Sequence, residues 1–253
     1  MRFIRYRASG EDAWGKVEDQ AVQSLGSAPP WESRKPAGRT AHLDHVTLLA
    51  PALPSKIVAI GLNYRDHAGE MGAPLPEEPL LFLKPPSAVA GPEAEIVLPE
   101  AAQRVDYEGE LAVVIGVRTK DVTPAEARKR IFGYTCMNDV TARDLQAKDG
   151  QWSRAKGFDT FACVGPAIET AADPGNLAIE TWLNGARVQA SRTDQLIFDV
   201  FALVSYVSRV MTLEPGDIIS TGTPAGVGPI APGDVVEVRI EGVGTLRNTA
   251  IKA

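Results

Sequence analysis

The most constraining feature of this sequence is that its apolar residues fall in short runs separated by turn residues. From residue 57 onward, runs rich in Val, Ile and Leu alternate with segments containing Gly or Pro, of which the chain has 23 and 19. Apolar runs of strand length between turn residues predict β-strands. Asn184-Gly185, between two such runs, predicts a two-residue hairpin. The strands expected here are residues 57–62, 80–83, 111–117, 134–137, 177–183, 217–220 and 235–240.

Only two segments have a persuasive helical pattern. Thr123, Pro124 and Glu126 form a capping box with proline at the first helical position, which predicts a helix from 124 to about Ile131. A second helix is expected from Asp194 to about Met211, because the apolar residues there fall on one stripe. That stripe consists of Leu196, Ile197, Val200, Phe201, Val204 and Val207. The chain is therefore expected to be mainly β with a few helices, an α+β fold.

The N-terminal residues differ from the rest of the chain. Residues 3–6 and 13–18 are typical of short strands around a polar turn, and a stretch rich in Pro, Ser and charge follows from 27 to 40. A second Pro-containing segment, 49–54, leads into the apolar strand at 57. We therefore expect a small N-terminal domain, residues 1–52, and a main domain, residues 53–253.

Histidine and cysteine are scarce, which limits the kinds of metal site. The 253 residues include three histidines and two cysteines, too few for a Cys/His zinc array, a cysteine-ligated iron–sulfur cluster or a disulfide framework. Cys136 and Cys163 are therefore interpreted as reduced, buried side chains. Any metal must be bound mostly by carboxylates, which favours Mg²⁺ or Mn²⁺, with Ca²⁺ as a further candidate.

The charge of the chain limits its partners. With 32 acidic and 26 basic side chains the formal net charge is −6, and no basic block is present. Such a chain has no electrostatic footprint for nucleic acid or an anionic membrane. No apolar run approaches the ~18 residues of a membrane span, and the N-terminus has no apolar signal segment. We therefore expect a cytoplasmic protein with no nucleic-acid or membrane partner.

Three carboxylates form the first candidate site. Glu108 and Glu110 precede the apolar run 111–117, and on a strand they point to the same face with Cα atoms roughly 7 Å apart. Asp139 follows the strand at 134–137, where a buried strand gives way to a polar turn. Together they offer three oxygen ligands for a divalent cation. The alternatives are two glutamates on a solvated strand end and an Asp139 that caps the following turn.

A histidine and a glutamate form a second candidate. His67 and Glu70, at i and i+3 on a short helix capped by Asn63, fall on one face. A carboxylate next to an imidazole raises its basicity and fixes its tautomer, which suits a general base that activates water. The glycines and prolines after this helix suit a mobile lid. The alternative is an ordinary pair on the surface.

Two more residues are less distinctive by themselves. Lys156 is expected in a turn, where the ordinary interpretation is a solvated lysine. Thr223 lies in the glycine-dense loop 221–229, which lacks the spacing of known nucleotide-binding loops. Its hydroxyl and the open backbone amides of the loop suit a small carboxylate, and a structural turn is equally compatible.

Seven short segments occur in a fixed order along residues 57–229. They are Gly61-Leu62-Asn63-Tyr64 with His67 and Glu70, Phe82-Leu83-Lys84-Pro85, Tyr107-Glu108-Gly109-Glu110-Leu111, Asn138-Asp139, Ala142-Arg143-Asp144-Leu145-Gln146, Ala155-Lys156-Gly157-Phe158-Asp159-Thr160 and Thr221-Gly222-Thr223-Pro224-Ala225-Gly226-Val227-Gly228. Any one of them is a weak signal. In this order and spacing they resemble the motifs of the fumarylacetoacetate hydrolase family.

This resemblance implies a fold and a metal site. The family has a mixed β-roll catalytic domain with a small N-terminal domain, and its members are usually homodimers. By the resemblance, Glu108, Glu110 and Asp139 bind Mg²⁺ or Mn²⁺. Larger members use a fourth metal carboxylate about seven residues before the histidine. Here that position is Ile60, so a water is expected in place of the carboxylate.

The resemblance also implies roles for the remaining candidates. His67 and Glu70 would form the water-activating dyad on a lid, and Lys156 would be catalytic. Contacts with the substrate are implied for Arg143, Gln146 and Thr223.

The sequence is most similar to the short bacterial and mitochondrial branch of the family, whose reactions share an enolate. Our leading hypothesis is a metal-dependent enzyme on 2-oxo acids, by C–C hydrolysis of acylpyruvates (fumarylpyruvate or acetylpyruvate) or decarboxylation of oxaloacetate. An alternative is a 2-hydroxyhepta-2,4-diene-1,7-dioate isomerase or 5-carboxymethyl-2-oxo-hex-3-ene-1,7-dioate decarboxylase of aromatic catabolism. A non-catalytic cation-binding β module is the alternative of another class. The choice of substrate depends on lid and pocket side chains that include Arg65, Met71 and Trp152.

Overall fold

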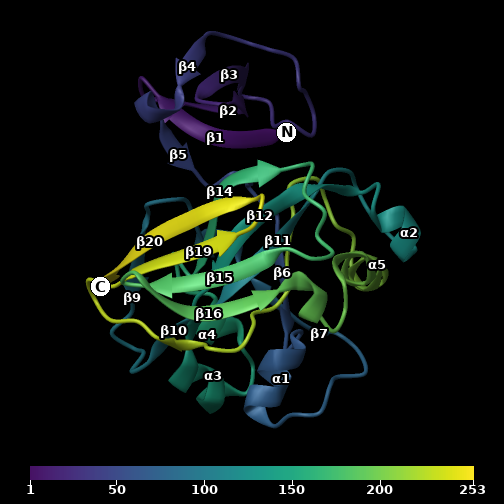
Figure 1. The fold of residues 1–253 in the computed structure, drawn as a ribbon, viewed down its shortest axis with the longest axis vertical. Coiled ribbons are helices and arrows are strands. Elements are labelled where there is room, and N and C mark those ends of the chain that lie inside the picture. Colours follow the sequence, from purple (N-terminus) through teal and green to yellow (C-terminus); the bar gives the residue numbers. More distant parts are fainter.

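The strands of the molecule are arranged in three β-sheets, and its computed structural model describes residues 1–253 (Figure 1). In the largest sheet the strands lie in the order β4 (Thr40–His42), β3 (Ala21–Gly26), β2 (Glu11–Glu18), β1 (Arg2–Ala8), β14 (Ala162–Glu169), β12 (Ile131–Asp139), β11 (Gly109–Ile115), β17 (Ile218–Ser220), β6 (Ile57–Gly61) and β7 (Leu80–Lys84). β5 (Thr47–Leu49) pairs with β1, and β8 (Val89–Ala90) pairs with β14.

Two smaller sheets complete the β-structure. One has the order β16 (Ala186–Arg192), β15 (Ala178–Leu183), β19 (Val235–Ile240), β20 (Gly244–Lys252) and β9 (Glu95–Leu98). The other contains β13 (Thr141–Ala142), β10 (Val105–Tyr107) and β18 (Gly228–Pro229). The helices are short: α1 (Arg65–Met71), α2 (Pro124–Ala127), α3 (Arg143–Asp149), α4 (Ser153–Lys156) and α5 (Val200–Val210). The expected mainly β fold with few helices is confirmed.

The N-terminal strands β1 to β5 form a part of their own at the top of Figure 1. This part is not separate from the largest sheet, because β1 pairs with β14 through Arg2–Glu169 and Phe3–Ile168. The division into residues 1–52 and 53–253 stays a prediction.

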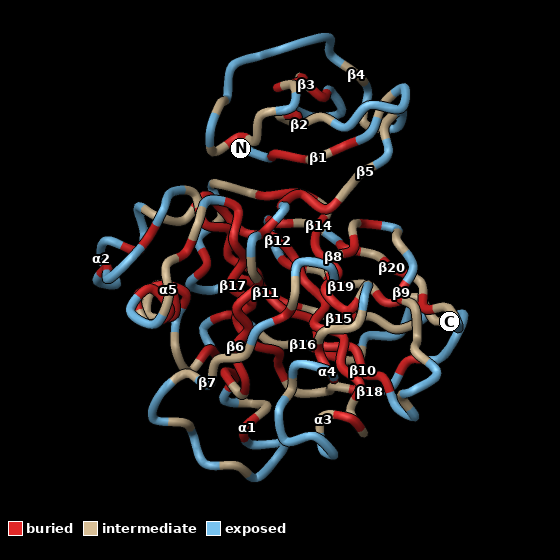
Figure 2. The backbone as a smooth tube through the Cα atoms, turned by 180° about the vertical axis from the view of Figure 1, so that it is seen from behind, coloured by how far each residue is buried: buried red, intermediate tan, exposed pale blue.

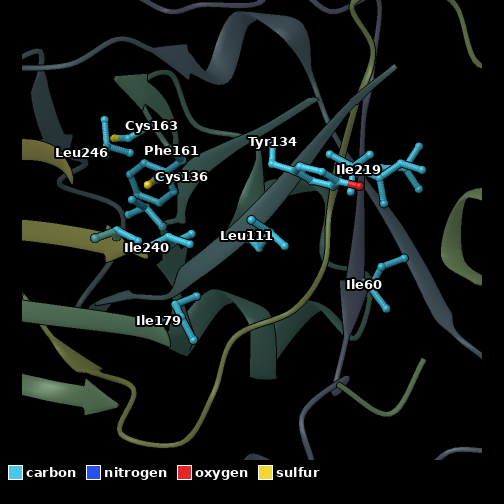
Figure 3. Close-up of a cluster of buried hydrophobic side chains, with 14 of the residues drawn as sticks. Ile60, Leu111, Tyr134, Cys136, Phe161, Cys163, Ile179, Ile219, Ile240 and Leu246 are labelled. Carbon is cyan, nitrogen blue, oxygen red and sulfur yellow. The ribbon is translucent and has the colours of Figure 1, made fainter. Parts of the chain in front are cut away.

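The core lies between the centre of the largest sheet and the five-stranded sheet. All seven residues of β11 are buried, so both faces of this strand are covered by other parts of the chain. Figure 3 shows Leu111 and Cys136 facing Ile179 and Ile240 from the smaller sheet. Burying one such aliphatic side chain stabilises the fold by about 1.5–3 kcal/mol. Cys136 and Cys163 are free, buried thiols, as predicted.

Both predicted helices are shorter than expected. The capping box is present, since the Thr123 hydroxyl accepts from the Glu126 amide and the Glu126 carboxylate accepts from the Thr123 amide. The helix nevertheless ends at Ala127, and the prediction of helix to Ile131 is wrong. Ile131 pairs with Ile115 as the first residue of β12, so the chain must leave the helix before it.

The second helix begins later than its apolar stripe predicts. Asp199 accepts hydrogen bonds from the amides of Phe201 and Ala202, two of the first-turn amides that have no partner within the helix, and α5 starts directly after it. Upstream, the side-chain amide of Asn63 both accepts from the Phe198 amide and donates to the Phe198 carbonyl. The segment before Asp199 is therefore held out of the helix, and the predicted start at Asp194 is wrong.

The short helices α1, α3 and α4, which contain several of the candidate site residues, lie in the lower part of Figure 1. Figure 2 shows that the segment between α1 and β7 is mostly exposed. None of the helices has the length and apolar character needed to cross a membrane.

Candidate active site and metal centre

The three predicted carboxylates converge where β10, β11 and β12 meet. Glu108 lies between β10 and β11, Glu110 is the second residue of β11, and Asp139 is the last residue of β12. The register holds them together, because the Asp139 amide donates to the Glu108 carbonyl at 2.8 Å. Their ligand atoms all lie within 4.8 Å of one another. All three are buried, at 6%, 1% and 0% exposure, so the glutamates do not form a solvated strand end. The Asp139 carboxylate accepts from Lys84 and Lys156 and from no backbone amide, so it does not cap the following turn.

A glycine makes this convergence possible. Gly109 lies between the two glutamates, and a Cβ atom there would come within 2.1 Å of the Thr181 hydroxyl on β15. Its amide donates to the side-chain carbonyl of Gln189 at 3.0 Å. The junction of β10 and β11 is thus pressed against the five-stranded sheet.

Three basic side chains contact the triad. Lys156 donates to Glu108 at 2.8 Å and to Asp139 at 2.6 Å, and its side chain is only 3% exposed. The interpretation of Lys156 as a solvated turn lysine is therefore wrong. The second contact is between Lys84 at the end of β7 and Asp139, at 2.5 Å. Arg143 donates to Glu108 at 2.5 Å.

These contacts set the charge states of Glu108 and Lys156. Burial alone would raise the pKa of Glu108, but the charges of Lys156 and Arg143 outweigh it and lower the pKa to about 2. Burial likewise acts to lower the pKa of Lys156, yet Asp139 and Glu108 hold that pKa above its ordinary value. Both groups are charged at neutral pH.

Glu110 has a different environment from the other two carboxylates. It accepts hydrogen bonds from the Ser220 hydroxyl at 2.5 Å and the Gly222 amide at 2.8 Å, both through Oε2, and pairs with no cation. Burial, together with the charges of Asp139 and Glu108, raises the pKa of Glu110 to about 8. In the absence of a cation, Glu110 is the protonated member of the triad at neutral pH.

The predicted His67–Glu70 pair forms on α1. His67 Nδ1 lies 3.1 Å from Glu70 Oε2, and both oxygens of Glu70 also accept from the Gly226 amide at 3.2 Å. The carboxylate of Asp66 accepts from the Ser191 hydroxyl at 2.5 Å. These contacts hold α1 over the site, while the mobility expected of a lid stays a prediction.

Asn63, expected to cap α1, does not do so. Tyr64 occupies the cap position and offers no side-chain bond. The amide group of Asn63 instead donates to the carbonyls of Phe198 and Thr221. It therefore ties the segment before α1 to two distant loops.

The three expected substrate contacts are already engaged with each other and with the chain. Arg143 donates to Asp106 at 3.0 Å and to the Gln146 side-chain carbonyl at 2.7 Å. The Thr223 hydroxyl donates to the Gly109 carbonyl at 2.9 Å. Their roles toward a substrate stay predictions.

The loop 221–229 differs from the open cradle that its glycines suggested. The Gly222 amide is used by Glu110 and the Gly226 amide by Glu70. The loop therefore binds carboxylates of this chain itself, one from the triad and one from α1.

One cavity of about 170 Å³ collects most of these groups. Asp139 and Glu70 are not among its lining residues, and neither is Arg65, whose guanidinium donates to the Leu196 carbonyl. The cavity is lined by Ile60, Gly61, Leu62, His67, Met71, Phe82, Glu108, Glu110, Arg143, Gln146, Trp152, Lys156 and Thr223.

Sequence reasoning missed the part played by Lys84. This lysine is fully buried and donates both to Asp139 and to the Val140 carbonyl. A charged residue that ends the apolar run Leu80–Lys84 was the available signal.

The donor set suits a hard divalent cation. All three ligand groups are carboxylates, and Glu110 Oε1 accepts no hydrogen bond within the chain. Oxygen ligands at this spacing fit Mg²⁺ or Mn²⁺. The residues present therefore fit the metal implied by the sequence.

Comparison with known proteins places the chain in a family. Residues 56–251 match the fumarylacetoacetate (FAA) hydrolase C-terminal family, and residues 1–51 match the family described as Rv2993c-like, N-terminal. The chain belongs to the fumarylacetoacetate hydrolase family. The resemblance noted in its motifs is thereby confirmed.

The proteins and solved structures that are similar to this chain are named for several different activities. An uncharacterized protein of Archaeoglobus fulgidus is 62% identical, over 83% of this chain and 84% of that protein. The mitochondrial oxaloacetate tautomerase fahd2 of Xenopus laevis is 43% identical, over 82% and 69%. The 2-hydroxyhepta-2,4-diene-1,7-dioate isomerase of Mycobacterium marinum has a TM-score of 0.93 and 46% identity, over 100% and 98% of the chains. The Sphingobium maleylpyruvate hydrolase, in complex with manganese and pyruvate, has a TM-score of 0.84 and 30% identity, over 100% of both chains.

Proposed function

We propose that this chain is a divalent-metal-dependent enzyme that acts on 2-oxo acids through an enolate. Its reaction is C–C bond hydrolysis of acylpyruvates, of the fumarylpyruvate or acetylpyruvate type, or decarboxylation of oxaloacetate. The observation that carries the proposal is one cavity lined by two carboxylates of the buried triad, by the buried lysine that is bonded to Glu108 and Asp139, and by the imidazole of the His67–Glu70 pair. A purely structural cation site uses neither the lysine nor the imidazole.

In this proposal Glu108, Glu110 and Asp139 hold Mg²⁺ or Mn²⁺. When bound, such a cation supplies Lewis acidity that stabilises negative charge on the 2-oxo oxygen of a substrate. The manganese and pyruvate in the Sphingobium maleylpyruvate hydrolase support both the donor set and the ligand class.

In this proposal Lys156 stabilises negative charge and His67 is the general base. The Lys156 ammonium places a fixed positive charge beside the developing enolate. Because Glu70 faces His67 Nδ1, the neutral imidazole carries its proton there and presents Nε2 as the base. In hydrolysis Nε2 takes a proton from water, the hydroxide adds to the distal carbonyl, and the electron pair of the broken C–C bond remains on the pyruvate enolate. The imidazolium then returns the proton to the enolate carbon, which gives pyruvate and the second acid. Decarboxylation needs no such water.

A second candidate reaction is isomerisation or keto–enol tautomerisation of a 2-oxo acid. The names of the Xenopus and Mycobacterium marinum relatives favour it. It uses the same enolate and transfers a proton between carbon and oxygen, without breaking a C–C bond. The same base and the same cation therefore serve both candidates.

The test is a substrate panel with product identification on the Mg²⁺- and Mn²⁺-loaded protein. Acetylpyruvate, fumarylpyruvate and oxaloacetate are supplied to the wild type, to Glu108→Gln and to His67→Gln. Loss of a general base typically costs 10²–10⁴-fold in rate, so His67→Gln should lose acylpyruvate hydrolysis by about that factor and retain more of any decarboxylation. His45 is exposed and lies in the N-terminal part of the chain, outside the lining of the cavity. His45→Gln is therefore the matched control and should behave as wild type.

Three results would contradict the proposal. Metal binding without turnover of any of these acids, tautomerisation included, supports the structural cation module. Full activity of Glu108→Gln after rigorous chelation would show that the carboxylate triad takes no part in the reaction. Turnover confined to enol–keto conversion assigns the second candidate in place of the first.

A further inference from the structure

A buried side-chain amide is bonded to the backbone of the candidate metal site. Gln189 lies on β16, the edge strand of the five-stranded sheet, is 1% exposed and is not among the residues that line the cavity. Its Oε1 accepts from the Gly109 amide at 3.0 Å, and its Nε2 donates to the Pro224 carbonyl at 2.8 Å. A backbone amide can only donate and a backbone carbonyl can only accept, so these two contacts leave one possible orientation of the side chain.

The same side chain directs the hydroxyl of Thr223. Gln189 Nε2 also donates to Thr223 Oγ1 at 2.9 Å, and the Thr223 hydroxyl in turn donates to the Gly109 carbonyl at 2.9 Å. Three residues therefore form a closed ring of hydrogen bonds, from the Gly109 amide to Gln189, then to Thr223 and back to the Gly109 carbonyl. All three are buried. A buried network whose members all have partners holds its groups rigidly.

This ring restrains the backbone on both sides of Gly109. The N–H of Gly109 belongs to the peptide group that follows Glu108, and its carbonyl belongs to the peptide group that precedes Glu110. Glycine is the residue with the most backbone freedom, so a restraint from outside has its largest effect there. The ring therefore determines how the two glutamates of the triad project from the chain. Both of them line the cavity.

The strand that contains Gln189 also supports the loop 221–229. Besides the contact at the Pro224 carbonyl, the loop packs on β16 at Gly226, where a Cβ atom would lie 2.2 Å from the Val188 carbonyl. The Gly226 amide donates to Glu70. Neighbouring residues of β16 therefore contact both the junction between the two glutamates and the loop that holds Glu70.

We propose that Gln189 is a positioning residue for the metal site. It acts through Gly109 on Glu108 and Glu110, and through Thr223 on the loop, and it contacts neither the cation nor the substrate. The inference rests on the proposed function for the presence of a divalent cation at the triad. Residues that orient metal ligands in this way typically contribute about 10–100-fold to metal affinity. Thr223 thereby gains a part in metal binding that is independent of any substrate.

A buried amide can also have a purely structural role, and the chain contains one for comparison. Asn248 on β20 lies in the same sheet and is 1% exposed, and its Nδ2 donates to the carbonyls of Gly91 and Ala94. None of these residues lines the cavity. Asn248→Leu therefore removes a buried amide with the same kind of partners but with no contact to the triad, and it is the matched control.

The experiment is a calorimetric titration of the metal-free protein with Mn²⁺ alone, which needs neither substrate nor turnover. Gln189→Met keeps the length of the side chain and removes all three hydrogen bonds. Thr223→Val keeps the shape of the side chain and removes the hydroxyl, and the double variant completes a mutant cycle. Urea denaturation gives the stability of each variant. The electron paramagnetic resonance spectrum at saturating Mn²⁺ reports the symmetry of the ligands around the ion.

The variants of the ring should differ from the control in metal binding. Gln189→Met should bind Mn²⁺ about tenfold or more weakly than wild type and should give an altered spectrum once saturated. Thr223→Val should also weaken Mn²⁺ binding, which the loss of a substrate contact alone would not do. Because both residues belong to one ring, the double variant should lose less affinity than the product of the two single losses. Asn248→Leu should lose stability and keep the Mn²⁺ affinity and spectrum of wild type.

Wild-type Mn²⁺ affinity with an unchanged spectrum in Gln189→Met would overturn the positioning role, and so would equal losses of affinity in Gln189→Met and Asn248→Leu. If Gln189→Met does not fold, Thr223→Val is the deciding variant, and unchanged Mn²⁺ affinity in it overturns the proposal. If the variants behave as expected but no 2-oxo acid is turned over, the proposed function fails and the positioning role stands. If the wild type binds no Mn²⁺, both proposals are overturned.

Discussion

The unusual protonation of Glu110 predicts that metal binding is coupled to proton release. The pKa of this carboxyl is raised to about 8 in the metal-free protein, whereas a metal ligand must be ionised. Each binding event near neutral pH should therefore expel close to one proton. The perturbation is a change of pH between 6 and 9, where ordinary carboxylates do not titrate.

The magnitude follows from the same pKa. With a pKa of about 8, the apparent dissociation constant for Mn²⁺ should be about twofold above its high-pH limit at pH 8, about elevenfold at pH 7 and about a hundredfold at pH 6. The assay is a Mn²⁺ titration at each pH. Calorimetry in buffers of different ionisation enthalpy counts the protons. Glu110→Gln should bind more weakly and lose the pH slope, and His67→Gln should keep it.

Folding stability supplies an independent readout with a defined sign. The folded-state pKa of Glu110 is raised above its ordinary value of 4.5 to about 8, so the unfolded chain holds fewer protons than the folded one between these limits. The free energy of unfolding of the metal-free protein should therefore decline as pH rises from about 5 to 8. The lowered pKa of Glu108 acts in the opposite sense only below pH 4.5. A metal affinity that is flat from pH 6 to 8, with no proton released, would refute the reasoning.

Three further predictions concern stability and reactivity. Lys84→Met leaves Asp139 Oδ1 without its buried partner and should lower the free energy of unfolding of the metal-free protein by about 3 kcal/mol. Urea denaturation measures the change, with Lys84→Arg as the comparison that keeps a positive charge. A Lys84→Met variant as stable as the wild type would contradict the ion-pair argument. Burial raises the pKa of the Cys136 and Cys163 thiols to about 12, so neither should react with a thiol reagent at pH 8 until denaturant is added; rapid native labelling would be the contrary result. Gly109→Ala drives a Cβ atom to 2.1 Å from a hydroxyl on β15 and should destabilise the fold by about 2 kcal/mol, whereas Gly185→Ala meets nothing within 4 Å at a turn of positive φ and should cost less.

The fold could be predicted from the sequence where the pattern is local. Alternation along Val235–Ile240 and the Asn184-Gly185 turn gave β19 and the β15–β16 hairpin, because both signals depend only on neighbouring residues. The errors occur where a distant partner decides. The start of α5 depends on Asn63, which lies 135 residues before Phe198. No apolar stripe contains that information.

The candidate site shows the same division. Glu108 and Glu110 were recognisable because they are two residues apart, and His67 and Glu70 because they share a helical face. Lys84 was not recognised, since its partner Asp139 is 55 residues away and a lysine at a strand end is ordinary. The loop amides of residues 221–229 read as free because the carboxylates they bind come from elsewhere in the chain.

The charges within the site favour the proposed catalytic centre over a purely structural cation site. Glu108 and Asp139 are each bonded to two basic groups, with Lys156 shared between them. The chain itself therefore compensates two of the three carboxylates, and the third is neutral when protonated. Folding does not need a cation to offset repulsion in this cluster, in contrast to a structural site whose carboxylates have no other partner. A divalent cation bound here adds positive charge beyond what the fold requires, and that surplus is available to an anionic ligand and to the negative charge that develops on it.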